Sequence, residues 1–189
     1  MEEPGHTPSF AVLGSARSEG HTARALRRLV DGLPCVTLDL LKTPVAPFSY
    51  GGAYPPDPFP GALERMASSP VTIFATPVYW FSYSAVMKGF IDRFTDHYPG
   101  GGRGPRPAPG SLQGRDFVLM ATGTAADLEP ALNLAFSQFC DCVGARCIAL
   151  LYAREGGPFT DEASVALVRE KMGAGISDPR GARLPSGVA

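Results

Sequence analysis

Hydroxyl and guanidinium side chains gather in one short segment near the start of the chain, where together they could bind a phosphate. The polar and small residues of this segment are Ser15, Arg17, Ser18, Gly20 and Thr22. If a helix begins directly after them, its unpaired first N–H groups and partial positive charge would add to the same site. An ordinary strand-to-helix turn would use similar residue types, so the segment alone leaves both interpretations open.

The elements on either side of this segment can be predicted from its apolar residues. Phe10 to Leu13 form a short apolar run typical of a strand that is buried on both faces. From His21 onward, apolar residues recur at helical spacing: Leu26, Leu29, Val30 and Leu33. The spacings G-x-G-x-x-G and G-x-x-x-x-G-K-[ST] are both absent here, so a bound phosphate would belong to another class of ligand.

A second unusual segment, Pro77–Phe81, contains three consecutive aromatic residues and follows an apolar run at Val71–Ala75. Three adjacent rings in a loop cannot all face one core, so we expect at least one to be exposed or to cover a ligand. Packing of the loop on its own domain is the alternative. Residues 66–86 carry no charge, but their prolines and hydroxyl residues argue against a membrane span. Ser82 is the predicted N-cap of the next helix.

The remaining elements alternate along the chain. Further strands are predicted at Cys35–Leu40, Arg115–Ala121 and Cys147–Tyr152, and further helices at Gly61–Ser68, Tyr83–Phe94, Leu128–Val143 and Asp161–Met172. Thr160 is the predicted cap of the last helix. A third polar turn, Thr122 to Ala125, follows the fourth strand.

Five apolar strands that alternate with helices predict an α/β fold with a parallel sheet covered on both faces. Right-handed crossovers leave the strand order 2-1-3-4-5 or the dinucleotide-binding order. In either order, ligands bind beyond the carboxyl ends of the strands, so the turns after the first, third and fourth strands should meet at one edge. Phosphate donors beside aromatic and small residues suit a planar, phosphorylated heterocycle, and FMN is the obvious candidate.

Composition narrows the possible partners. The 189 residues carry a net charge of −1, which argues against nucleic acid or an acidic membrane surface as a partner. The first residues lack a secretory signal, and the four cysteines lie mostly in apolar runs. We therefore expect a reduced cytoplasmic protein without a metal site.

The chain length suits a single domain over residues 1–189. We expect loose tails at 1–8 and 174–189. The Gly/Pro-rich segment 96–111 is expected to be a mobile surface loop. A second Pro-rich segment, 42–61, is long for a connection, and its aromatic residues suggest that it packs on another surface, for which a partner subunit is one candidate.

Three motifs give the chain a resemblance to a known family. They are Gly14-Ser15-x-Arg17 with Thr22, then Thr76-Pro77-x-Tyr79-Trp80-x-Ser82, then Lys88-Gly89-Phe90-Ile91-Asp92-Arg93. In order and spacing they resemble the NAD(P)H-dependent FMN reductases, which are flavodoxin-like oxidoreductases, over roughly Ser9 to Tyr152. The resemblance implies a flavodoxin-like three-layer sandwich whose five-stranded parallel sheet has the order 2-1-3-4-5. The chain departs from the family pattern at His21, Ser84 and Thr124.

The resemblance also implies a set of cofactor-binding residues. By this likeness, the FMN phosphate would be bound by Ser15, Arg17, Ser18, His21 and Thr22. The isoalloxazine would lie along Pro77, Val78, Tyr79, Trp80 and Phe81, with Thr122, Gly123 and Thr124 at its other edge. No catalytic side chain is implied, because the flavin itself performs the chemistry.

The implied activity is transfer of hydride from NADPH or NADH to FMN and on to a small acceptor such as a quinone, flavin, azo or nitro compound. Family members also imply a homo-oligomer, a dimer or a dimer of dimers, with the site near the interface. Two other classes stay open. One is a flavodoxin-type electron carrier, which the weak net charge disfavours, and the other is a binding or regulatory protein that keeps only the fold.

Overall fold

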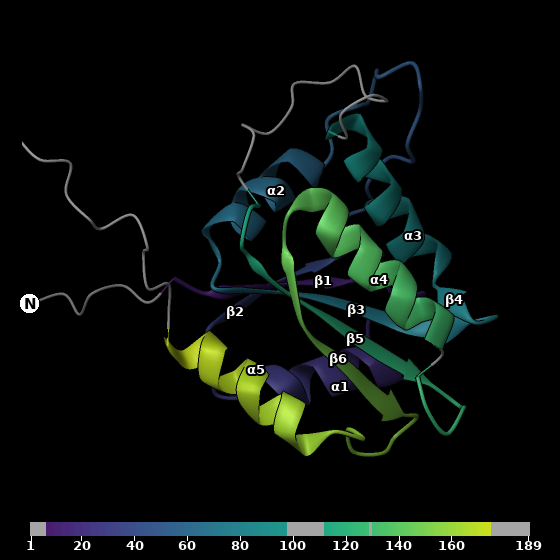
Figure 1. Cartoon of the computed structure of the whole chain (residues 1–189). Helices are drawn as coiled ribbons and strands as arrows, with labels where there is room; N and C mark the ends of the chain where they lie inside the picture. The colour runs from purple at the N-terminus through teal and green to yellow at the C-terminus, as the bar shows by residue number, and fades with distance from the viewer. Residues whose placement is uncertain (1–6, 98–111, 129, 175–189) are drawn as a thin grey trace, which may run out of the picture.

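The apolar runs of the sequence form the parallel strands of one sheet (Figure 1). The computed structural model describes residues 7–97, 112–128 and 130–174. The strands are β1 (Ser9–Leu13), β2 (Cys35–Asp39), β3 (Val71–Tyr79), β4 (Ser82–Tyr83), β5 (Asp116–Gly123) and β6 (Arg146–Arg154). The helices are α1 (His21–Val30), α2 (Phe59–Ser68), α3 (Ala85–Asp92), α4 (Pro130–Val143) and α5 (Glu162–Ala174), with a 3₁₀ helix at η1 (Arg93–His97).

The strand order is β2-β1-β3-β5-β6, and each neighbouring pair is parallel. This confirms the predicted order 2-1-3-4-5 and excludes the dinucleotide-binding order. The two-residue strand β4 was not predicted, and it pairs antiparallel with the end of β3. Because Leu13 pairs with both Asp39 and Ala75, β1 and β2 end side by side, whereas β3 continues past them to Tyr79.

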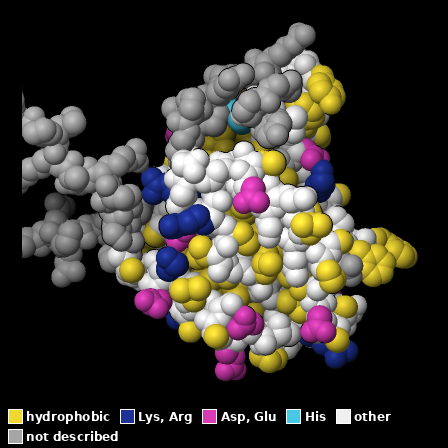
Figure 2. Space-filling model, viewed as in Figure 1, with side chains coloured by type: hydrophobic (Ala, Val, Ile, Leu, Met, Phe, Trp, Pro, Cys, Tyr) yellow, Lys and Arg dark blue, Asp and Glu magenta, His cyan; other side chains and the backbone are white. Residues whose placement is uncertain are grey.

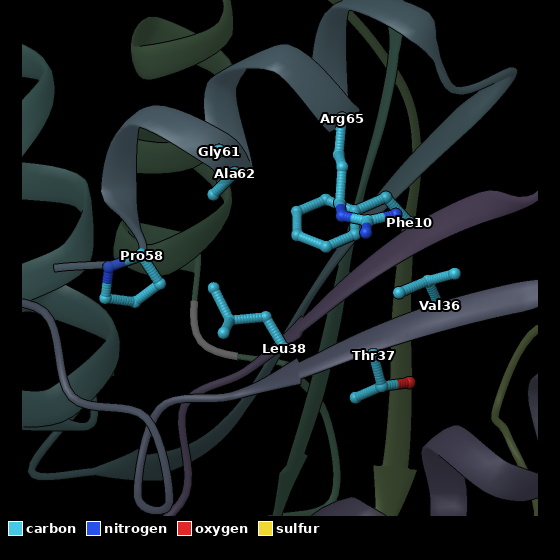
Figure 3. Close-up of a pocket in the computed structure, with 8 residues that line it drawn as sticks. All are labelled: Phe10, Val36, Thr37, Leu38, Pro58, Gly61, Ala62 and Arg65. Carbon is cyan, nitrogen blue, oxygen red and sulfur yellow. The ribbon is translucent and has the colours of Figure 1, made fainter.

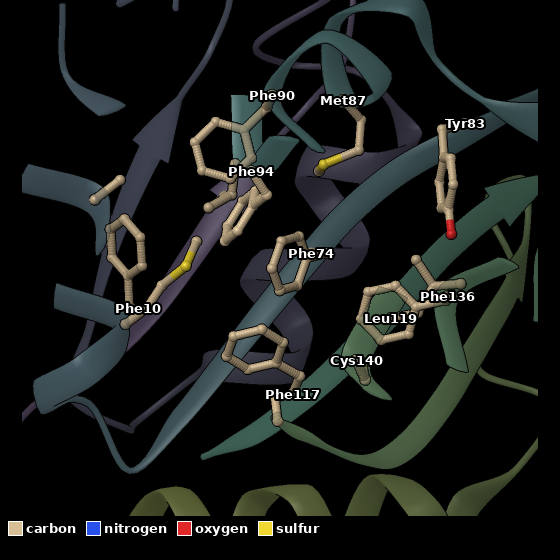
Figure 4. Close-up of a cluster of buried hydrophobic side chains, with 14 of the residues drawn as sticks. Phe10, Phe74, Tyr83, Met87, Phe90, Phe94, Phe117, Leu119, Phe136 and Cys140 are labelled. Atoms are coloured by element: carbon tan, nitrogen blue, oxygen red, sulfur yellow. The ribbon is translucent and has the colours of Figure 1, made fainter. Parts of the chain in front are cut away.

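Helices cover both faces of the sheet, as Figure 1 shows, with α2, α3 and α4 on one side and α1 and α5 on the other. The core on the first side is rich in phenylalanine, and Figure 4 shows Phe74 at its centre, from β3. The ring of Phe74 lies 5.1 Å from that of Phe117 and 5.3 Å from that of Phe136. The core on the second side is built from aliphatic residues and methionines of β1, β3, β5, β6, α1 and α5. Burial of both faces explains why the strands read as continuous apolar runs.

Two predicted helix caps are wrong. Ser82 lies in β4, and the N-cap of α3 is Ser84, whose Oγ accepts a hydrogen bond from the Met87 backbone N–H at 3.1 Å. At the last helix the carboxylate of Asp161, not Thr160, accepts from the Ser164 N–H at 3.0 Å. In both cases a neighbouring polar residue with the same capping chemistry is better placed by the tertiary structure.

The Pro-rich segment 42–61 is pinned to the end of α3 by Arg93. This buried arginine donates to the Ala46 carbonyl at 3.0 Å and forms an ion pair with Asp57 at 2.5 Å. Its guanidinium also stacks on the ring of Tyr54, with 3.5 Å from its central carbon to the ring centroid. The segment therefore packs on its own domain, and its last residues from Phe59 onward belong to α2.

Parts of three predicted segments lie outside the described residues. They are residues 1–6 and 175–189 of the predicted tails and residues 98–111 of the predicted surface loop. Within the ranges that are described, no helix is both long and apolar enough to cross a membrane.

Candidate functional site

The turns after β1, β3 and β5 meet around one hollow of about 190 Å³ at the carboxyl edge of the sheet. We call it the strand-end hollow, and its lining residues are Ser15, Arg17, Gly20, His21, Thr22, Pro77, Val78, Tyr79, Thr122, Gly123, Thr124 and Glu155. The predicted convergence of the three turns is therefore correct. All the residues predicted for the site line this hollow except Ser18, Trp80 and Phe81.

The first turn begins at Gly14, where the chain passes very close to α3. A Cβ at Gly14 would lie 2.6 Å from the Cβ of Met87, so only glycine fits here. The backbone of Gly14 is held on both sides, because its N–H donates to the Ala75 carbonyl at 2.8 Å and its carbonyl accepts from Ser84 Oγ at 2.6 Å. The turn between β1 and α1 is thus fixed to β3 and α3 before the chain enters α1.

At the start of α1 the donor groups are left available to a ligand. Gly20 is the N-cap and has no side chain to accept from the first helical N–H groups, so the helix is not capped internally. Ser15 is buried beside them, and its Oγ accepts from the Arg17 backbone N–H at 3.3 Å. A hydroxyl and the uncapped amides of a helix are the donor set that a phosphate group requires. These residues therefore fit the phosphate of FMN.

Thr22 and Thr122 join two walls of the hollow although they lie 100 residues apart in the sequence. Both side chains are buried, and their Oγ1 atoms lie 2.7 Å apart. Because each hydroxyl has one hydrogen and two lone pairs, this bond leaves capacity on each oxygen for a ligand.

His21 and Glu155 form a polar corner of the hollow. Arg24 donates to His21 Nδ1 at 2.9 Å, and since a guanidinium has no acceptor, Nδ1 must be the acceptor nitrogen. The other ring nitrogen, Nε2, lies 3.8 Å from a carboxylate oxygen of Glu155. The sequence reasoning missed Glu155, which follows β6 and reaches the site because its N–H donates to the Gly123 carbonyl at 2.9 Å.

The second turn, predicted as a loop between a strand and a helix, is a tight hairpin. Pro77, Val78 and Tyr79 continue β3, and Tyr79 pairs with Ser82 of β4 across two turn residues. Those two residues, Trp80 and Phe81, have positive φ values of 49° and 62°, which bulky L-residues rarely adopt. Their side chains are 93% and 69% exposed. Figure 2 shows hydrophobic side chains projecting from the molecule where Figure 1 places β4.

The third turn is shaped by Tyr152 of β6. A Cβ at Gly123 would lie 2.9 Å from the Tyr152 hydroxyl oxygen, so the tyrosine occupies the space that a larger residue would need. Burial raises the pKa of Tyr152, so its hydroxyl stays protonated and donates to the Ala125 carbonyl at 3.0 Å. This bond links the turn after β5 to the neighbouring strand β6. Thr124, in the same turn, stays exposed at the rim of the strand-end hollow.

The site contains donors for an anion and a backbone-lined slot, and it lacks a metal-binding set. In the part of the chain that the structure describes, no three His, Cys, Asp or Glu side chains are grouped to hold a metal ion. An open parallel sheet with a hollow outside the carboxyl ends of β1, β3 and β5 defines a flavodoxin-like protein.

Comparison with known proteins identifies the family within this fold class. The sequence profile described as NADPH-dependent FMN reductase matches residues 9–150. The chain belongs to this family. A curated relative from Bacillus subtilis (strain 168), named "Putative NAD(P)H-dependent FMN-containing oxidoreductase YwqN", is 35% identical over 90 residues. That match covers 44% of this chain and only 50% of the relative, so the chain matches half of the relative's length.

Solved structures show the same fold at low identity. The Trp repressor binding protein from Bacillus subtilis has a TM-score of 0.62 at 22% identity, over 88% of this chain and 95% of that one. The apo form of the NADH:FMN oxidoreductase EMOB has a TM-score of 0.59 at 18% identity, over 92% of each chain. An NADPH-quinone reductase from P. pentosaceus has a TM-score of 0.57 at 11% identity, over 90% of this chain and 98% of that one. At these identities the likeness supports the fold alone.

Proposed function

We propose that this protein is an FMN-dependent NAD(P)H oxidoreductase that reduces a small acceptor such as a quinone, flavin, azo or nitro compound. The observation that carries this proposal is the strand-end hollow, where the uncapped start of α1 meets the ends of β3 and β5. Membership of the NADPH-dependent FMN reductase family supports it. When bound, FMN supplies the hydride chemistry, and the protein supplies binding and orientation.

The residues around the phosphate would act mainly through hydrogen bonds. Ser15 and Thr22 offer hydroxyls, the first turn of α1 offers backbone N–H groups, and Arg17 offers a guanidinium at the exposed rim. An arginine on a phosphate is among the stronger hydrogen-bonding pairs in proteins, because both partners are charged. His21 lies at the same rim, with Nε2 toward Glu155.

The flat ring of the flavin would lie between the ends of β3 and β5. Pro77, Val78 and Tyr79 line one side through the strand backbone and the Tyr79 ring, and Thr122 to Thr124 line the other. Tyr79 is 46% exposed, so its ring can border both the bound flavin and a second ligand. Because the site holds no buried acid–base pair, no proton-transfer residue is assigned.

We further propose that the protein is a homo-oligomer in which the hairpin of Tyr79, Trp80 and Phe81 contacts a second copy. Three adjacent aromatic side chains projecting into water are costly unless another surface covers them. Two copies joined at this hairpin would enclose the slot beside Tyr79. Gel filtration with light scattering tests this directly, and a monomer at working concentration would contradict it.

The test of the main proposal is optical. The purified protein, after incubation with FMN and removal of excess flavin, should be yellow and should bleach within seconds of anaerobic mixing with NADPH or NADH. Reoxidation by a quinone should restore the colour. Flavin that binds but is not bleached would support an electron carrier instead, and failure to bind flavin would support a protein that keeps only the fold.

A further inference from the structure

Two cysteines meet where α4 leads into β6. Cys140 is fully buried in the core on the α4 side of the sheet, and Figure 4 shows it beside Phe136. Cys147 is half-buried and packs against the same core from β6, which is an edge strand. It stands near the start of that strand, whereas Glu155, which lines the strand-end hollow, follows its end. The two cysteines therefore lie apart from the candidate flavin site.

The turn between α4 and β6 folds the chain back on itself and brings the two cysteines together. The Ala145 N–H donates to the Cys140 carbonyl at 2.9 Å. The Gly144 N–H donates to the Asp141 carbonyl at 3.2 Å, with Gly144 at a φ of 76°. This pair of bonds around a left-handed glycine is the Schellman motif, which ends a helix and reverses the chain. Cys147 therefore returns alongside the last turn of α4.

Strand pairing directs the Cys147 side chain toward α4. Its partner in the register of β5 and β6 is Phe117, whose ring stacks on that of Phe139 from α4, with centroids 6.3 Å apart. Paired residues of neighbouring strands project from the same face of a sheet, so Cys147 faces α4 as well. The register shifts directly after this pair, at a β-bulge that interrupts the regular ladder. The start of β6 thus presents both a thiol and an irregular backbone to the helix.

Three donors converge on the sulfur of Cys147. They are the thiol of Cys140, the hydroxyl of Ser137 and the backbone N–H of Ala149. The bond from Cys140 has the largest effect, and together the three lower the pKa of Cys147 against the opposing effects of burial and the Asp141 charge. The same hydrogen bond and burial raise the pKa of Cys140, which stays a protonated thiol. The negative charge therefore rests on Cys147, the more exposed of the two sulfurs.

We propose that Cys140 and Cys147 are a peroxide-responsive dithiol, in which Cys147 reacts with the oxidant and Cys140 then closes a disulfide. In the first step the Cys147 thiolate displaces hydroxide from hydrogen peroxide, which leaves a sulfenic acid on Cys147, and the hydroxide takes up a proton. In the second step the Cys140 sulfur displaces the sulfenic oxygen, which leaves as water with the thiol proton. The two sulfur atoms thus give two electrons to the O–O bond, and one peroxide becomes two molecules of water.

The contact between the two thiols favours the disulfide over further oxidation of Cys147. The sulfur atoms of a disulfide lie about 2 Å apart. Two sulfurs that are already in hydrogen-bond contact reach this separation by a small shift of the end of α4. Because β6 is an edge strand, peroxide approaches the half-buried Cys147 directly and the fully buried Cys140 only through it. The order of the two steps follows from this difference in exposure.

The other two cysteines of the chain are matched controls. Cys142 follows Cys140 by two positions on α4, so it projects from a different face of the helix, and it is exposed. Cys35 begins β2, at the opposite edge of the sheet, and packs on the α1 side. Its neighbour Val36 lines the hollow between β2 and α2 that Figure 3 shows. Burial raises the pKa of Cys35 to about 11, so it remains a thiol at neutral pH.

Peroxide oxidation of the complete, reduced protein tests the proposal. After treatment with equimolar hydrogen peroxide, the remaining thiols are alkylated and the protein is cut with trypsin, which separates the two cysteines by cleavage after Arg146. The expected product is a pair of peptides that is joined through Cys147 and released by a reductant. Cys35→Ser and Cys142→Ser should give the same joined pair, and electrophoresis without reductant should show no link between chains.

Variants of the pair separate the two roles. In a Cys142→Ser background, Cys147→Ser should lose the joined peptides and react with peroxide about tenfold more slowly, because the thiolate is the reacting form. Cys140→Ala should still react but stop at the sulfenic acid, which dimedone labels. Melting curves show whether each variant is folded, and the test uses no flavin, so its outcome is independent of the proposed function.

Three results would overturn the proposal. One is the absence of the joined peptides after peroxide treatment of the unaltered protein. Another is a disulfide that links Cys140 to Cys142 or links two chains. The third is an unchanged rate of reaction in folded Cys147→Ser.

Discussion

Thr22 and Thr122 meet through a hydrogen bond of 2.7 Å between their Oγ1 atoms, at the point where the first turn of α1 reaches the end of β5. Both residues are almost fully buried, so the bond between them is largely shielded from water. Within the strand-end hollow, the bond fixes the first turn of α1 relative to the turn that follows β5. Its removal should therefore affect the fold and the ligand together.

Thr122→Val should lower the free energy of unfolding by about 1–3 kcal/mol, because Thr22 Oγ1 would lose its buried partner. FMN affinity should fall as well, since Thr22 would no longer be held in place. Thr72→Val is the matched control, because Thr72 Oγ1 is buried without a hydrogen-bond partner and its replacement removes no bond. Urea unfolding and flavin fluorescence titration measure the two effects, and equal results for both variants would contradict the role of this bond.

Arg17→Ala should weaken FMN binding by about 1.5–3 kcal/mol, the value of one hydrogen bond between charged groups. The melting temperature without flavin should change little, because Arg17 is exposed and its backbone N–H, not its side chain, bonds to Ser15. Arg65→Ala serves as the control for loss of one surface cation. Unchanged FMN affinity in Arg17→Ala would remove this side chain from the phosphate site.

Gly123→Ala should destabilise the protein by about 1–3 kcal/mol, because the new methyl group would lie 2.9 Å from the hydroxyl oxygen of Tyr152. Tyr152→Phe in the same chain should restore part of the loss by removing that oxygen. By itself Tyr152→Phe should cost about 1 kcal/mol, since the Ala125 carbonyl loses its donor. Thermal melts of the two single variants and the double variant test this, and strictly additive losses would refute the contact.

Replacing Trp80-Phe81 with Asn-Gly should stabilise the isolated fold. Both positions have positive φ in a two-residue hairpin turn, a geometry that Asn-Gly adopts readily and that costs bulky residues about 1–3 kcal/mol each. The melting temperature should rise. The KM for the nicotinamide donor should also rise, and any oligomer should dissociate, because the projecting rings are gone. A more stable protein with unaltered kinetics and assembly would show that the strained aromatics serve neither purpose.

The ion pair of Arg93 and Asp57 should make the free energy of unfolding depend on pH in the acid range. Burial acts to raise the pKa of Asp57, but the hydrogen bond from Arg93, those from the backbone N–H groups of Phe59 and Ala46, and the Arg93 charge together lower it. Since the folded pKa is below the unfolded value of about 3.9, the stabilisation is complete above about pH 4 and is lost as pH falls through the folded pKa.

Asp57→Asn should accordingly reduce stability at pH 7 and flatten the loss of stability below pH 4. Urea unfolding at a series of pH values measures this difference. Asp31→Asn is a suitable control, since Asp31 is exposed at the end of α1. Parallel pH profiles for Asp57→Asn and the unaltered protein would show that another carboxyl group governs acid unfolding.

Local sequence patterns were sufficient to predict the five parallel strands, the main helices and the meeting of the three turns, but they left two strand orders open and missed β4. Strands buried on both faces give continuous apolar runs such as Phe10–Leu13, and helices give regular spacing such as Leu26, Leu29 and Val30, because each period follows from backbone geometry. The position of Ser15 and Thr22 after a strand and at a helix start fixes which edge of the sheet they occupy.

Contacts between distant residues decided what these patterns could not. Ser84 replaces Ser82 as a helix cap because its hydroxyl also donates to the Gly14 carbonyl, and Trp80 and Phe81 turn outward because β4 pairs with β3. Glu155 lines the strand-end hollow although it lies far along the chain from Ser15 and Thr22, and no local pattern in the sequence signals this proximity. The sequence by itself determined the layered fold and the polar residues that follow the first strand, because both depend on local spacing. The walls of the strand-end hollow depend on packing and hydrogen bonds between distant segments, which only the tertiary structure sets.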